Sequence, residues 1–135
     1  MQKTYHKKEV PELAQEKCGV IYALELIGGK WRLPVLWKLS KQETIRYNEL
    51  RRQLPGVTNT MLTRVLVDLE ANGLVVRQAY EQVPPHVEYR LTESGRSLIP
   101  ALEIIGAWGR SKMEQEHGEH LVQQGLEGRT KQEQQ

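Results

Sequence analysis

The segment from Thr58 to Gly73 has the clearest pattern of apolar and polar positions in the chain. Four of its apolar residues recur at i, i+3, i+4 and i+7, the spacing of one helix face: Leu62, Val65, Leu66 and Leu69. Thr58 can cap free backbone N–H groups at the start, and Asn72-Gly73 suits a left-handed C-cap at the end. The pattern therefore predicts an amphipathic helix with one face in the core.

The opposite face of this predicted helix carries hydrogen-bonding side chains near its N-terminal end. They are Asn59, Thr60, Thr63 and Arg64. Side chains of this kind can reach base edges in the major groove of double-stranded DNA. An ordinary amphipathic helix with a solvated outer face has the same pattern, so the neighbouring segments decide between the two interpretations.

The segments before Thr58 predict short helices. Val20 to Ile27 is apolar on nearly every side and needs cover on both faces, which a second subunit can supply in so small a domain. Lys30 to Leu39 is amphipathic, and Pro34 must lie in its first turn, where a missing N–H costs least. The tryptophans of the chain favour core or interface positions, although they could also line a ligand pocket: Trp31, Trp37 and Trp108.

A short strand and a short helix follow. Thr44 to Arg46 can form a very short strand, and Tyr47 to Leu54 predicts a helix with Arg51 and Arg52 outward. Residues 55–57, Pro-Gly-Val, then form a turn into Thr58. A helix, a tight turn containing glycine and a second helix is the helix-turn-helix arrangement.

The pattern changes to that of strands after Gly73. Leu74 to Val83 is rich in β-forming residues, and Val87 to Leu91 alternates strictly. Pro84-Pro85-His86 lies between them, and two prolines mark the tip of a hairpin because they cannot donate ladder bonds. A hairpin directly after a recognition helix is the wing of a winged helix. Its cations can contact a phosphate backbone: Arg77, His86 and Arg90.

A last long helix begins after the cap residue Thr92 and carries a broad apolar face: Leu98, Leu102, Ile105 and Trp108. Pro100 should bend this helix. The fold class that follows is mainly α with a small β-hairpin, a winged helix-turn-helix that is dimeric through its N- and C-terminal helices. We expect a mobile N-terminal arm (1–17), the winged domain with its dimerisation helices (18–113) and a polar, partly disordered tail (114–135).

The distribution of charge along the chain is more informative than its net charge. The net charge of the 135-residue chain is +2, a weak argument for nucleic acid. Between residues 30 and 90, however, ten Lys/Arg stand against six acidic residues, whereas residues 111–135 hold three bases and five acids. The single cysteine suits a reducing compartment. Since there is no signal peptide or apolar run of membrane-spanning length, we expect a cytoplasmic protein without a membrane partner.

The sequence contains no pattern typical of an enzyme, a metal site or a cofactor site. No Ser/His/Asp or Cys/His pairing has a diagnostic spacing. Gly28-Gly29-Lys30 is not a phosphate-binding loop, because Trp31 stands where serine or threonine is required. His117 and His120 lack the His-Glu-x-x-His pattern and are better interpreted as solvated surface. We therefore predict no catalytic residue, no metal and no cofactor.

With these segments placed, the chain resembles the HxlR-type branch of bacterial winged helix-turn-helix regulators, which are relatives of the MarR regulators. The matching landmarks run from Cys18 to Trp108 and are specific as an ordered set. They are Ile27-Gly28-Gly29-Lys30-Trp31, Tyr47-Asn48-Glu49-Leu50, Leu54-Pro55-Gly56-Val57, Met61-Leu62-Thr63, Leu69-Glu70, Gly73-Leu74-Val75, Val83-Pro84-Pro85-His86-Val87-Glu88-Tyr89, Leu91-Thr92 and Gly95-Arg96.

The resemblance implies transcriptional control by a homodimer whose terminal helices pair. It implies two recognition helices on a pseudo-palindromic operator, with wings on the flanking minor grooves. Family members are often responsive to small-molecule electrophiles or oxidants, and a cysteine before the first helix serves several of them as a redox sensor. That position is Cys18 here, and the residue after it is Gly19 where the family usually has proline, which leaves the thiol environment less fixed.

Two alternatives stay open from the sequence. Cys18 beside Lys17 and a helix N-terminus would favour a reactive thiolate, yet a half-buried cysteine at a helix start need have no redox role. A winged helix can also serve as a protein–protein adaptor without sequence-specific DNA binding. The cations clustered around the expected groove face favour DNA.

Overall fold

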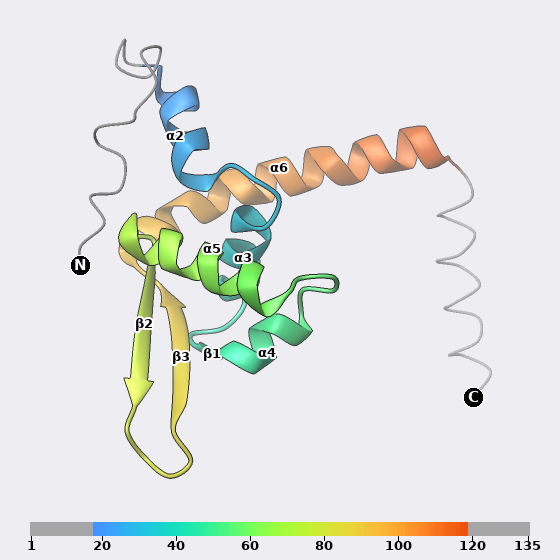
Figure 1. The fold of residues 1–135 in the computed structure, drawn as a ribbon. Coiled ribbons are helices and arrows are strands. Elements are labelled where there is room, and N and C mark those ends of the chain that lie inside the picture. The colour runs from blue at the N-terminus through green and yellow to red at the C-terminus, as the bar shows by residue number, and fades with distance from the viewer. Residues whose placement is uncertain (1–17, 119–135) are drawn as a thin grey trace, which may run out of the picture. The chain divides into compact units, whose positions relative to one another are not determined.

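The computed structural model describes residues 18–118, which fall into two compact units, one through Ile99 and one from Pro100. The predicted arm (1–17) and most of the predicted tail lie outside the described residues. The first unit contains α2 (Gly19–Ile27), α3 (Arg32–Leu39), β1 (Ile45–Arg46), α4 (Tyr47–Arg52), α5 (Asn59–Ala71), β2 (Val75–Tyr80) and β3 (His86–Leu91), as Figure 1 shows. α6 (Glu93–His117) begins in this unit and continues through the second.

The α5 helix forms as the sequence predicts. The Thr58 hydroxyl accepts a hydrogen bond from the Met61 backbone N–H at 3.1 Å, which fixes the first turn. Gly73 ends the helix with φ +75°, a conformation that glycine adopts without strain. The predicted apolar stripe is buried at Leu62, Leu66 and Leu69, whereas Val65 at its edge is half-buried. Because this apolar stripe is buried, the opposite, polar side of the N-terminal half of α5 faces solvent.

The wing is confirmed, and it belongs to a three-stranded antiparallel sheet in the order β1-β3-β2. β1 is the short strand that the sequence predicts, but its pairing with β3 is new: Ile45 lies opposite Tyr89. The expected strand bounds were wrong at the tip, since β2 ends at Tyr80 rather than Val83 and β3 begins at His86 rather than Val87. The His86 ring stacks on Tyr80 with centroids 4.7 Å apart, so the last pair closes the ladder there.

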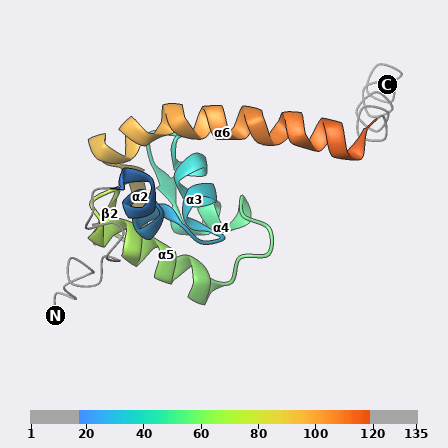
Figure 2. The ribbon, with the colours of Figure 1, turned by 90° about the horizontal axis from the view of Figure 1, so that it is seen from above.

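The core of the first unit lies between the helices and one face of the sheet. α3 packs on α4, α5 and β3, and Figures 1 and 2 show it beside α5 in both views. Pro34 lies in the first turn of α3 as predicted, but the helix begins at Arg32 rather than Lys30. Arg32 donates to the Glu25 carbonyl at 2.9 Å and pairs with Asp68 at 3.0 Å. This one side chain therefore joins the end of α2 to α5.

The first and last helices carry apolar side chains in the open. α2 has no buried residue, and Val20 and Leu24 are 71% and 57% exposed. In the second unit, α6 exposes Ile104, Ile105 and Trp108 by 72%, 54% and 67%. α6 continues through Gly106 and Gly109 to His117. Within residues 18–118, no helix combines the length and the apolar character needed to cross a membrane.

Candidate DNA-binding surface

The first two turns of α5 present the four polar side chains that the sequence predicts. Asn59, Thr60, Thr63 and Arg64 are all exposed. Asn59 and Thr63 lie one turn apart and face α4, because both contact the Tyr47 hydroxyl of that helix. Thr60 and Arg64 lie on the other flank, where they line a hollow with the segment that links α2 to α3. The N-terminal half of α5 thus exposes two pairs of polar side chains, Asn59 with Thr63 and Thr60 with Arg64.

Tyr47 at the start of α4 is a site residue that sequence reasoning missed. Its hydroxyl lies 3.2 Å from Asn59 Oδ1, 3.3 Å from the Asn59 carbonyl and 3.2 Å from Thr63 Oγ1. The sequence pattern indicates only that Tyr47 opens a short helix. The bond to α5 depends on how the turn at residues 53–57 folds one helix against the other, which no local pattern reports.

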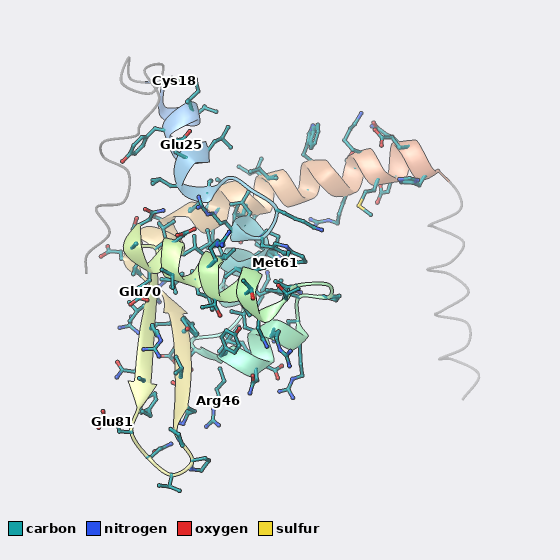
Figure 3. The ribbon with its side chains drawn as sticks, viewed as in Figure 1. Cys18, Glu25, Arg46, Met61, Glu70 and Glu81 are labelled. Atoms are coloured by element: carbon teal, nitrogen blue, oxygen red, sulfur yellow. The ribbon has the colours of Figure 1, made fainter. Side chains whose placement is uncertain are left out.

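A groove of about 880 Å³ lies between α4, β1 and the hairpin. Three arginines line it, one from each element: Arg46, Arg52 and Arg77. Sequence reasoning also missed Arg46, because no pattern in the chain distinguishes it from the other cations. Figure 3 shows it extending from the junction of β1 and α4 into the space beside β3. Glu49 and Glu88 also line the groove, so its three arginines are only partly compensated. Tyr47 lies in the same lining and connects the groove to the polar face of α5.

The two α4 arginines are both exposed as expected but differ in their partners. Arg52 forms an ion pair with Glu49, three residues earlier. Hydrogen bonds from Gln53 and then from Arg52 lower the pKa of Glu49, so this carboxylate stays charged and offsets part of the Arg52 charge. Arg51 has no ion pair with any side chain in residues 18–118. Arg51 is therefore the less compensated cation of the two.

The wing cations do not share one face. Arg77 lies opposite Tyr89, whose side chain is buried, while Arg90 lies opposite Val76, one position along the ladder. Successive side chains of a strand alternate between the faces, so Arg77 and Arg90 lie on opposite sides of the sheet. Burial raises the pKa of Tyr89, which a hydrogen bond from Arg77 partly opposes. Tyr89 thus stays a neutral phenol beside Arg77.

His86 is already engaged within the wing. Its Nδ1 lies 3.0 Å from Gln82 Nε2 and its Nε2 lies 3.2 Å from Glu88 Oε1. With both ring nitrogens bonded and the ring stacked on Tyr80, His86 holds the turn in shape. The tip itself is apolar, since Val83 is fully exposed between Gln82 and the two prolines.

The comparisons with known proteins agree with this arrangement. The model of the HxlR-like helix-turn-helix family matches residues 26–117. The chain belongs to this family. It is 47% identical over 102 residues to the HTH-type transcriptional regulator YkvN of Bacillus subtilis (strain 168), covering 76% of this chain and 86% of YkvN. The HxlR-like chain is thus a transcriptional regulator of the helix-turn-helix type.

Solved structures give the same result for the fold of this HxlR-like protein. The redox regulator HypR in its oxidized form superposes with a TM-score of 0.66 at 46% identity, covering 70% of this chain and 96% of that one. A MarR-family regulator from Porphyromonas gingivalis W83 gives 0.67 at 36% identity, covering 70% and 92%. The architecture is the MarR-like winged helix.

Cys18, the expected redox position of this HxlR-like protein, lies at the N-cap of α2. It is half-buried, and its thiol makes no capping hydrogen bond. Figure 3 shows it at the end of α2 that points away from the wing.

Proposed function

We propose that this HxlR-like regulator binds a pseudo-palindromic DNA operator sequence-specifically, as a homodimer. The observation that carries the proposal is the exposed polar face of α5, held beside a groove lined by arginines from α4, β1 and the wing. Asn59, Thr60, Thr63 and Arg64 supply donors and acceptors to base edges in the major groove. Arg46, Arg51, Arg52 and Arg77 supply positive charge to the flanking phosphates.

The remaining wing residues take smaller parts in this proposal. Arg90 lies on the sheet face opposite Arg77 and near the base of the hairpin, so it contacts at most an outer phosphate. His86 acts by shaping the tip, which carries Val83 to a flanking minor groove.

The proposed homodimer rests on the exposed apolar side chains of α2 and α6. Val20, Leu24, Ile104 and Trp108 are each more than half exposed in the protomer. Large exposed apolar side chains that cluster on single helices mark protein–protein contact sites. Two copies would cover them and would set two α5 helices about one turn of DNA apart, the spacing that a palindrome of half-sites requires.

Arg64→Ala should weaken operator binding by about 1–3 kcal/mol if Arg64 contacts a base, with relaxed preference at one base pair. Arg64 is exposed beside Thr60 and so is free to extend into the major groove. Titration against the operator and its single-base variants at several salt concentrations measures this. If the salt slope alone falls by about one unit, Arg64 contacts a phosphate instead.

A gel-shift assay with the DNA upstream of the gene for this protein and of its neighbour tests DNA binding directly. A salt-sensitive shift that specific but not scrambled DNA competes away supports the proposal. A protein that binds all duplexes equally, or none, would be better described as a winged-helix protein–protein adaptor, the second candidate function.

We further propose that Cys18 makes the regulator responsive to an oxidant or electrophile. The support is its free thiol at the start of α2 and the similarity to a protein described as a redox regulator. The Cys18→Ser protein should still bind the operator, but treatment with hypochlorite or a quinone should no longer release it from the DNA. Gel shifts before and after treatment measure this. A Cys18→Ser protein that is still released by the oxidant would exclude this role.

A further inference from the structure

We infer that Tyr47 is a positioning residue that fixes which base edges the first two turns of α5 recognise. The inference rests on the proposed DNA binding and adds a residue outside α5 to it. Tyr47 is half-buried in the wall of the groove, while its hydroxyl reaches two exposed side chains of the recognition helix. The ring of Tyr47 is therefore held in the groove wall, while its hydroxyl contacts Asn59 and Thr63, two of the side chains proposed to contact bases.

The donors and acceptors around this hydroxyl determine its polarity. Both Asn59 atoms within reach are carbonyl oxygens, and these can only accept a hydrogen bond. The single Tyr47 proton therefore goes to Asn59. The contact to Thr63 Oγ1 at 3.2 Å is then made by the Thr63 hydroxyl, which donates to the Tyr47 oxygen.

These hydrogen-bond directions leave Thr63 with only an acceptor, and Asn59 with only donors, for contacts to DNA bases. With its proton directed at Tyr47, Thr63 offers only lone pairs, so it matches a base that donates in the major groove, adenine through N6 or cytosine through N4. Asn59, whose Oδ1 already accepts from Tyr47, offers its two amide protons to an acceptor such as guanine O6 or thymine O4. A threonine without Tyr47 could match either kind of base.

Tyr47→Phe removes the hydroxyl and keeps the ring in the groove wall. The operator is first defined for the wild type by selection from a randomised duplex library, and every base pair of a half-site is then varied for both proteins. We expect affinity for the best operator to fall about 10-fold, with preference lost at the base pairs that face Thr63 and Asn59. Binding to random DNA, the salt slope and the melting temperature should be unchanged.

A double-mutant cycle with Thr63→Val separates positioning from direct contact. Since Tyr47 acts through Thr63 at that base pair, Tyr47→Phe/Thr63→Val should lose no more preference there than Thr63→Val alone. Tyr80→Phe is the matched control: it removes an exposed tyrosine hydroxyl from the last residue of β2 and keeps the ring that stacks on His86, so it should leave the base preferences intact.

The outcomes distinguish this inference from the proposed function. A wild-type protein that selects no motif would overturn DNA recognition itself. A wild type with a clear motif and a Tyr47→Phe protein with the same motif would overturn the role of Tyr47 only. A Tyr47→Phe protein that loses affinity for all DNA equally, with a lower melting temperature, would show Tyr47 to be merely structural.

Discussion

Replacement of Trp108 by glutamate should leave a folded monomer that binds the operator between about 100-fold and 10,000-fold more weakly. The indole is 67% exposed in the protomer, so a charge at this position disturbs little within the chain. In the proposed dimer the same position is covered, and a buried unpaired carboxylate opposes association. Once the two recognition helices are unlinked, the second half-site no longer contributes through effective concentration, which accounts for a loss of this size.

Sedimentation equilibrium and operator titration measure the two parts of this prediction separately. Arg110→Glu is the control: it places a carboxylate at an exposed position on the opposite side of α6, about 200° around the helix from Trp108. The control should stay dimeric and bind the operator normally. A Trp108→Glu protein that remains dimeric with full affinity would mean that the exposed face of α6 is not the dimer contact.

Much of α5 could be predicted because its determinants are local. The Thr58 cap, the buried stripe from Leu62 to Leu69 and the left-handed Gly73 are each encoded within a few residues of the element they define. The same holds for Pro34 in the first turn of α3. Signals of this kind act over one or two turns, so they can be recognised without knowing how the rest of the chain folds.

The site was predicted less completely because its geometry depends on register and on contacts distant in sequence. Arg77 and Arg90 seemed equivalent until the ladder set them on opposite sheet faces, and that parity depends on the length of the turn from Tyr80 to His86. Tyr47 lies 12 residues before Asn59, and only the fold of the intervening turn brings them together. Arg46 becomes a groove residue because β1 pairs with β3.

Gly95, one of the sequence landmarks, has a role that the pattern did not explain. It is buried at the start of α6, where its N–H donates to the Thr92 hydroxyl at 3.0 Å. A Cβ at this position would lie 2.3 Å from the Leu74 carbonyl oxygen and 3.3 Å from Leu91 Cδ2. The Leu74 oxygen cannot move aside easily, because it accepts the Thr92 backbone N–H at 3.0 Å. The start of α6 and Leu74, the residue before β2, thus approach each other so closely that only glycine, which has no Cβ, fits at position 95.

Gly95→Ala should therefore destabilise the protein by about 2–3 kcal/mol, toward the upper end of the range for overpacking. For a domain of this size the melting temperature should fall by about 10–20 °C, which calorimetry or thermal circular dichroism measures. Gly19→Ala, whose Cβ meets nothing within 4 Å, should change stability by no more than about 0.5 kcal/mol. If both variants have the melting temperature of the wild type, the added Cβ at position 95 is accommodated without strain. The glycine at position 95 would then not be explained by the close approach of α6 to the Leu74 carbonyl.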